Sequence, residues 1–162
     1  MKFRAATLVF ATTLTMSLSA WAQEAVVDVT LNPMGDFKAK TTAVKGQAVK
    51  KGDEFTATNI VVNLKSLKTG VDVRDKHTQK HLQTDKFPDA VLLSASGKGG
   101  KGKGRIKIKG IEKDIEGTYK VEGNLLKAKF NLNIADFGIK DINYMGVGVE
   151  DTVTLNVSVP IK

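Results

Sequence analysis

The chain has 162 residues and a formal net charge of +8, because 25 Lys and Arg side chains outnumber 17 Asp and Glu side chains. This length suits one domain with a core of ordinary size. The absence of cysteine excludes disulfides and thiolate metal sites. The domain must therefore be stable through packing alone, as a closed sheet would be.

The first 22 residues have the three zones of a secretory signal peptide. Two basic residues precede an uncharged apolar run from residue 5 to 18, and Ala20 and Ala22 place small residues where a signal peptidase reads. A retained membrane anchor is the alternative, but the run is short for a span of about 20 residues. We expect cleavage near Ala22, a mature domain of residues 23–162, and a periplasmic or secreted protein.

Beyond residue 24 the dominant hydrophobic period is two. A strand directs successive side chains to opposite faces, so each alternating stretch predicts a half-buried strand. Turn signals such as Glu122-Gly123-Asn124 favour antiparallel hairpins. About eight strands without alternating helices predict an all-β sandwich or barrel, between which the period does not decide. In chain order, the predicted strands cover residues 26–31, 37–49, 59–64, 90–96, 105–109, 114–121, 126–134 and 152–161.

One polar segment breaks this pattern and predicts a short helix over residues 73–83. Asp72 is the expected N-cap, with Asp75 three positions further on in a near capping box. Pro88 prevents a helix from continuing beyond Phe87.

No pattern of catalytic residues emerges. The two histidines, His77 and His81, share one predicted helical face, and two imidazoles at this spacing can chelate a divalent metal. The Glu of a metalloprotease helix is missing, and a third ligand would have to come from Asp75 or Asp85. No serine stands in a nucleophile elbow. We predict no metal site, no cofactor and no enzyme activity, with a metal-dependent activity at the histidine pair as an alternative.

A basic hairpin is predicted around the glycine-rich run of residues 98–104. Strand alternation places Arg105, Lys107 and Lys109 on the outer face. Such a patch could contact an anionic membrane surface, or it could be a solvated rim that protects a sheet edge. Nucleic acid is excluded as a partner, because no aromatic residues are interleaved with the patch. Its basic residues are Lys98, Lys101, Lys103, Arg105, Lys107 and Lys109.

The segment from residue 66 to 96 resembles the signature of the YceI-like family. Its elements are Ser66-Leu67, Thr69-Gly70, Arg74-Asp75-x-His77, Leu82 and Asp85-x-Phe87-Pro88. Later segments are also similar to the family pattern, namely Ile108-x-Gly110-Ile111-x-Lys113, Ile134-x-Asp136-Phe137-Gly138-Ile139 and Glu150-Asp151-x-Val153. No single motif is specific, but they occur in order and with sensible spacing.

The resemblance implies an extended eight-stranded antiparallel β-barrel, similar to a lipocalin, with one short helix near one mouth. It also implies an exported lipid-binding protein whose partner is a long apolar ligand, typically a polyisoprenoid or an isoprenoid quinone. A small barrel can instead fill its lumen with side chains, so a ligand-free structural or envelope-interaction barrel is the alternative. The residues expected to line the lumen are Val62, Leu64, Ile106, Ile108, Ile115, Tyr119, Leu126, Phe130, Leu132, Val153, Leu155 and Val157.

The motif residues of the family are expected to serve the architecture. Arg74 and Asp75 would fix the helix on the barrel, Phe87-Pro88 would turn the chain into the next strand, and Phe137 would close one end of the lumen within a bend. The sequence leaves formation of a homodimer open. The complete set of motif residues is Arg74, Asp75, His77, Phe87, Pro88, Asp136, Phe137 and Gly138.

Overall fold

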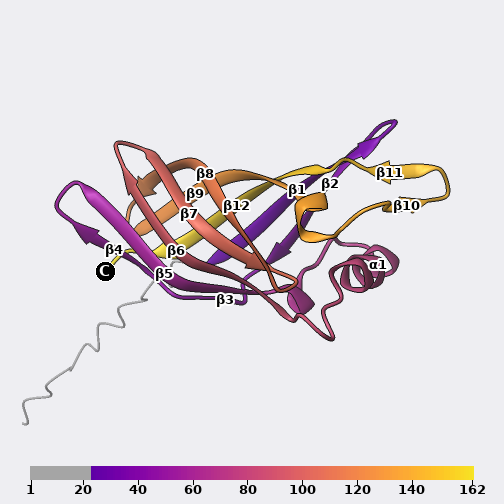
Figure 1. Cartoon of the computed structure of the whole chain (residues 1–162), viewed down its shortest axis with the longest axis horizontal. Helices are drawn as coiled ribbons and strands as arrows, with labels where there is room; N and C mark the ends of the chain where they lie inside the picture. The colour runs from indigo at the N-terminus through magenta and orange to yellow at the C-terminus, as the bar shows by residue number, and fades with distance from the viewer. Residues whose placement is uncertain (1–22) are drawn as a thin grey trace, which may run out of the picture.

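The computed structural model describes residues 23–162, so the predicted signal peptide lies outside the described part of the chain. These residues form one strongly curled antiparallel sheet with a single α-helix beside it (Figure 1). None of the helices within residues 23–162 is long and apolar enough to cross a membrane. The expected all-β, barrel-like class is confirmed.

Eight strands of six residues or more make the body of the sheet, and four shorter strands are attached to them. The long strands are β1 (Glu24–Asn32), β2 (Asp36–Thr41), β5 (Glu54–Asn63), β6 (Asp89–Lys98), β7 (Lys101–Ile108), β8 (Ile111–Glu122), β9 (Leu125–Asn133) and β12 (Thr152–Pro160). The short strands are β3 (Val44–Lys45), β4 (Ala48–Lys51), β10 (Asn143–Tyr144) and β11 (Val147–Val149).

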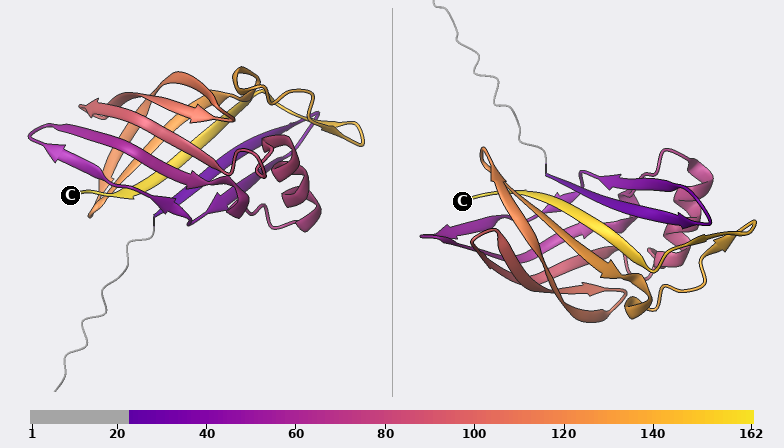
Figure 2. Two further views of the ribbon diagram at one scale, coloured as in Figure 1. Left: turned by 60° about the horizontal axis from the view of Figure 1, so that its bottom comes forward. Right: turned by 90° about the horizontal axis from the view of Figure 1, so that it is seen from above.

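The sheet curls without closing as an even barrel. Strands β5 to β9 pair in chain order, and β12 joins β9 to β1, which also pairs with β2. Among residues 23–162, no ladder joins β2 to β5. An isolated bridge at Lys40–Lys68 connects β2 to the segment before α1, and another at Ala48–Ile161 connects β4 to the residue after β12. The result is a half-barrel with a seam (Figure 2). It agrees with the barrel-like class that the resemblance implied, and differs from the expected eight strands in the four additional short ones.

The predicted strand over residues 37–49 is wrong as a single element. The chain divides this stretch into β2, β3 and β4. Gly46 lies between β3 and β4 with a φ of +121°, which glycine adopts at little cost. An added Cβ there would lie 2.6 Å from the Cδ1 atom of Ile60, so this turn also needs the close approach that glycine allows.

The predicted helix is found as α1 (Asp72–Leu82), but its predicted N-cap is wrong. Val71 occupies the cap position without a side-chain hydrogen bond, and Asp72 is the first helical residue. The carboxylate of Asp75 instead accepts hydrogen bonds from Thr69, outside the helix. At the other end, Gln83 takes a left-handed conformation with a φ of +52° and ends the helix.

The two ends of the half-barrel differ in construction. Helix α1, the 3₁₀ helix η2 (Ile134–Phe137) and the β10–β11 hairpin gather at one end (Figure 1). The β4–β5 turn and the C-terminus lie at the opposite end (Figure 1). A second 3₁₀ helix, η1 (Leu64–Ser66), links β5 to the segment before α1.

Glycines inside β7 and β8 allow neighbouring strands to approach closely. A Cβ at Gly104 would lie 2.5 Å from the carbonyl oxygen of Ser94, and a Cβ at Gly117 would lie 2.4 Å from that of Lys129. Both contacts are with backbone, which cannot rotate away. The curvature of this wall therefore depends on the absence of a side chain at these two positions.

We expect Gly117→Ala to lower the free energy of unfolding by about 1–3 kcal/mol, because the added methyl group forces β8 and β9 apart. Urea denaturation would measure this loss. Gly148→Ala is the matched control, since its Cβ would have no neighbour closer than 3.7 Å. Equal stability of the two variants would contradict the role assigned to Gly117.

Candidate functional site

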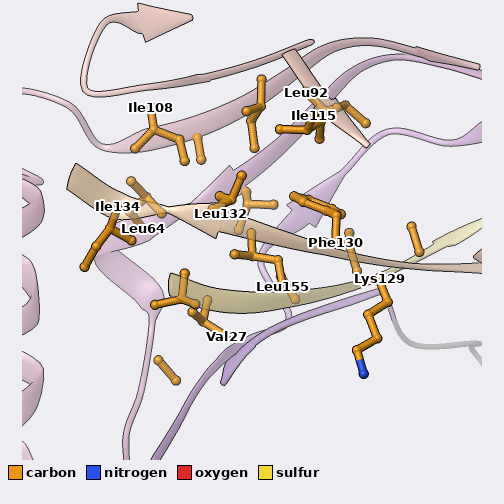
Figure 3. Close-up of a pocket in the computed structure, with 18 of the residues that line it drawn as sticks. Val27, Leu64, Leu92, Ile108, Ile115, Lys129, Phe130, Leu132, Ile134 and Leu155 are labelled. Atoms are coloured by element: carbon orange, nitrogen blue, oxygen red, sulfur yellow. The ribbon is translucent and has the colours of Figure 1, made fainter. Parts of the chain in front are cut away.

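A cavity of about 790 Å³ lies inside the curled sheet. This volume falls within the range of small-molecule pockets, roughly 300–1,000 Å³. Figure 3 shows aliphatic side chains from opposite walls, among them Val27, Leu92 and Leu132, around the same space. The Nζ atom of Lys129 is directed away from these side chains (Figure 3), so this lysine leaves the interior apolar.

All twelve residues predicted to line the lumen lie on the wall of this cavity. Strand alternation placed them correctly because it fixes which face each side chain shares. Some are fully buried, such as Ile106 and Leu132, whereas others, such as Phe130 and Leu155, are only partly buried. Their role in ligand binding stays a prediction. The twelve are Val62, Leu64, Ile106, Ile108, Ile115, Tyr119, Leu126, Phe130, Leu132, Val153, Leu155 and Val157.

The first two strands add a part of the wall that the predicted list omitted. Val27, Val29 and Leu31 of β1 face the cavity together with Phe37 and Ala39 of β2. The signal was present, since these apolar residues alternate with polar ones in the sequence. Their inclusion extends the apolar wall to the seam of the half-barrel.

An aromatic pair lies at the end of the cavity remote from α1. The rings of Phe55 and Tyr119 meet edge to face with centroids 5.4 Å apart, a favourable aromatic geometry. A Cβ at Gly97 would lie 2.5 Å from the Cε1 atom of Tyr119. The tyrosine ring therefore lies directly over a glycine, which leaves it room to lie against the sheet.

The other end of the cavity is bounded by α1, from which the apolar residues Val73 and Leu82 and four polar residues line it. Arg74, His77, Thr78 and His81 all line the cavity, and their spacing of three, four and seven residues places them on one helical face. The guanidinium carbon of Arg74 lies 4.6 Å from the centroid of the Phe37 ring. The ring centroids of His77 and Tyr144 are 4.9 Å apart.

Burial lowers the pKa of His81 below its ordinary value, and the positive groups nearby, His77, Lys80 and Lys109, lower it further. Burial acts in this way because it penalises the charged imidazolium. The sequence indicated the histidine pair but missed the complete polar stripe. The recurrence of polar residues at intervals of three, four and seven positions was the signal that would have revealed this stripe.

Asp75 lies away from the cavity and ties α1 to the preceding loop. Its Oδ1 atom accepts hydrogen bonds from the backbone N–H and the hydroxyl of Thr69, both at 2.7 Å, and Oδ2 lies 3.3 Å from Nζ of Lys68. The Thr69 hydrogen bonds hold the pKa of Asp75 below its ordinary value, against the opposing effect of burial.

The remaining motif residues lie at turns beside the cavity. The carbonyl oxygen of Pro88 accepts a hydrogen bond from the N–H of Leu64 at 2.7 Å, directly before β6 begins. Phe137, at the end of η2, is 1 % exposed and forms part of the cavity wall. Gly138 ends η2 in a left-handed conformation with a φ of +67°. Phe87 and Asp136 do not line the cavity.

The basic hairpin is exposed along most of its length, with one exception. Arg105 pairs with Glu112 at 3.3 Å on the outer face, and Lys107 is exposed. Lys109, which we expected on the same outer face, instead donates from Nζ to the carbonyl oxygens of His81 and Gly138 at 3.4 and 3.1 Å. It therefore links α1 to the bend after η2.

Within residues 23–162, no group of three or more His, Asp or Glu side chains is arranged to hold a metal ion. The two histidines thus have no third protein ligand beside them in this part of the chain. Their surroundings are the apolar cavity and the ring of Tyr144.

A curled antiparallel sheet around an apolar cavity defines the class of barrel-like proteins whose interior can hold a small ligand. Within this class, the model of the YceI-like domain family matches residues 5–161. The chain therefore belongs to the YceI-like family. A search of curated proteins found no match.

Solved structures with a similar fold include three distant ones. A polyisoprenoid-binding domain from Saccharophagus degradans, implicated in plant cell wall breakdown, is 12% identical with a TM-score of 0.56, covering 85% of this chain and 91% of that one. BcnA from Burkholderia cenocepacia is 13% identical with a TM-score of 0.63, covering 84% and 93%. A mutant CJ YCEI protein with a monobromobimane guest is 15% identical with a TM-score of 0.53, covering 98% and 89%. At these identities the likeness concerns the fold.

We expect Asp75→Asn to lower the melting temperature by several degrees at neutral pH, because the carboxylate that accepts both Thr69 hydrogen bonds is lost. A group with a depressed folded-state pKa stabilises the fold above its unfolded pKa and loses this effect as the pH falls. The difference between wild type and variant should therefore shrink below pH 3.8, the ordinary value for this group. Thermal melts at several pH values would measure it. Asp72→Asn, at an exposed position on the same helix, should show no comparable difference.

Proposed function

We propose that this chain is an exported binding protein that carries or sequesters a long apolar isoprenoid-type ligand, a polyisoprenoid or an isoprenoid quinone, inside its cavity. The observation behind the proposal is the cavity of about 790 Å³ with an almost entirely apolar wall. Protein interiors contain few voids larger than a water molecule, and empty apolar cavities are destabilising. A cavity of this size therefore favours an occupant.

The family adds support for a lipid ligand. The domain family is YceI-like, and one protein with a similar fold is described as a polyisoprenoid-binding domain. Transfer of the ligand class to this chain is our inference. It agrees with an interior where aliphatic side chains from β1, β5, β7, β9 and β12 converge.

The energetics of such a ligand require no catalytic group. Burial of each methylene contributes about 0.8 kcal/mol, which over a long chain offsets the cost of immobilising it. The site therefore acts by enclosure, and the chain works as a binding module and not as an enzyme.

Export of the protein would explain why an apolar molecule needs to be bound. If the predicted signal peptide directs export, the mature domain works in the periplasm or outside the cell, where an apolar molecule needs a carrier to cross water. Contact of the basic hairpin with an anionic membrane surface, and formation of a homodimer, stay predictions.

The alternative of a ligand-free structural barrel requires a lumen filled by its own side chains. The partly buried positions on the wall, such as Leu126 and Phe130, do not fill it. The metal-dependent alternative depends on His77 and His81, which lack a third ligand among residues 23–162.

Organic extraction of the protein purified from its native host, followed by mass spectrometry, tests the proposal directly. We expect a bound lipid with an isoprenoid chain. A protein that yields no lipid, and that takes up no added polyprenol, would overturn the proposal.

We expect Ala95→Phe to weaken binding of a fluorescent polyprenyl probe at least tenfold, about 1.4 kcal/mol or more. Ala95 lines the cavity beside Ala57, its paired residue on β5, so the added ring would occupy ligand space. Ser94→Phe is the matched control, because the neighbouring Ser94 is exposed and does not line the cavity. Equal weakening by both variants would mean that the probe binds elsewhere.

A further inference from the structure

Most of the exposed apolar side chains lie at one end of the half-barrel. Eight large hydrophobic residues among residues 23–162 are exposed, and six of them belong to the β1–β2 turn, the start of α1 and the β10–β11 hairpin. These three segments gather at the same end (Figure 1). Apolar side chains that cluster on a surface mark an interaction site, whereas scattered ones do not. We call this cluster the apolar rim; its members are Met34, Val71, Val73, Tyr144, Met145 and Val147.

The tip of the β10–β11 hairpin is an unusual place for an apolar side chain. Met145 and Gly146 form its two-residue turn, with φ values of +52° and +82°, which match a type I′ turn. Asn or Asp is preferred at the first of these positions, because a bulky side chain is strained at positive φ. Met145 is nonetheless 86 % exposed. Neither the turn nor packing within residues 23–162 accounts for a methionine here, so its side chain indicates an apolar partner outside the chain.

The β1–β2 turn places a second methionine beside the first. Met34 is 83 % exposed in this turn, and Asn32 of β1 pairs with Gly148 of β11, so both turns project at the same end (Figure 1). These two residues are the only methionines of residues 23–162. The unbranched, flexible side chain of methionine adapts to irregular apolar surroundings, which suits contact with a surface that has no fixed shape.

The two projecting turns match an uncharged partner. Residues 29–35 and 142–149 contain no charged side chain, and the acids Glu150 and Asp151 follow the second stretch directly. The basic β6–β7 turn lies at the opposite end, because Lys98 pairs with Glu54 beside the β4–β5 turn. Charge complementarity at the apolar rim therefore favours an uncharged apolar surface over a polyanion.

The apolar rim is continuous with the mouth of the cavity, since all its members except Met34 also line the cavity. A stable interface between two proteins uses about 20–30 residues on each side, far more than six side chains on two narrow turns and the start of a helix. A fluid apolar layer needs no complementary shape and can surround such tips. The size and shape of the rim therefore favour a lipid layer over a second copy of the chain or another protein.

We propose that this end of the protein docks on a lipid bilayer, with Met34 and Met145 inserted among the acyl chains and Tyr144 at the level of the head groups, where tyrosine is favoured. Docking in this way places the mouth of the cavity against the membrane, so that an apolar ligand passes between bilayer and cavity without entering water. This transfer rests on the proposed function, whereas the contact with lipid needs no cavity ligand.

Flotation of the purified protein with vesicles tests the contact. Vesicles of pure phosphatidylcholine are compared with vesicles that also contain phosphatidylglycerol, each at low and high salt. Because the two turns carry no charge, we expect binding to both kinds of vesicle, and salt should change it by no more than about twofold. Contact through the basic β6–β7 turn would instead need the anionic lipid and would weaken as salt screens the charges.

The variant Met145→Asn removes the apolar tip without disturbing the turn, because Asn suits a type I′ turn. We expect a melting temperature no lower than that of the wild type and vesicle binding weakened about tenfold, since one side chain of this size no longer leaves water. Met34→Asn should weaken binding to a similar extent. Val121→Asn is the matched control, because Val121 is exposed near the end of β8, away from the rim, and its binding should stay within about twofold of the wild type.

A fluorescent label locates the contact on the protein. Because the chain has no cysteine, Met145→Cys and Val121→Cys each accept a single environment-sensitive dye. We expect the emission of the dye at position 145 to shift to the blue when phosphatidylcholine vesicles are added, and that of the dye at position 121 to stay unchanged.

Binding to phosphatidylcholine vesicles that is weakened by Met145→Asn and unaffected by Val121→Asn supports the inference. Absence of vesicle binding, binding that requires the anionic lipid, or an equal loss in the two variants overturns it. The proposed function is judged separately, by lipid extraction and probe uptake. A protein that takes up a polyprenyl probe from solution but does not float with vesicles keeps the proposed function and loses the docking surface.

Discussion

The curvature of the antiparallel sheet is the constraint on which the rest of the structure depends. Strand alternation directs one row of each strand inward, and curling brings those rows to face each other across a common space. Gly104 and Gly117 let the strands approach at β7 and β8, where a Cβ would meet backbone oxygen atoms at 2.5 and 2.4 Å. Because these two glycines have no side chains, they also leave part of the interior unfilled.

The seam of the half-barrel is closed by a few isolated backbone hydrogen bonds instead of a continuous ladder. At one point Lys40 exchanges backbone hydrogen bonds with Lys68, and at another Ala48 bonds to the C-terminal residue Lys162. The first bridge lies directly before Thr69, which donates to Asp75 of α1. Closure of the seam and the position of the helix are therefore parts of one connected arrangement.

The sequence predicted the cavity wall well because the period of two decides which residues share a face. It could not predict the division of residues 37–49, because the turn at Gly46 depends on the approach of Ile60 from β5. It also placed Lys109 outward, whereas the lysine turns to carbonyl oxygens on α1 and the bend after η2. These are contacts between segments distant in the chain, and local patterns do not encode them.

The sequence likewise could not predict which face α1 turns toward the cavity, because a helix with few apolar residues can dock against a sheet in several rotations about its axis. The hydrogen bonds from Thr69 to Asp75 fix the rotation. With Asp75 held against the loop, the polar residues Arg74, His77, Thr78 and His81 face the cavity together with Val73 and Leu82.

This mode of attachment explains how the cavity stays open beneath the helix. A helix held by apolar packing would bury its contact face in the interior and fill the space that a ligand needs. Helix α1 is tethered mainly from its side, by Asp75 toward the loop and by Lys109 toward its carboxyl end, while Leu82 near its end packs against the core. Most of its inner face therefore leaves the space below the helix open.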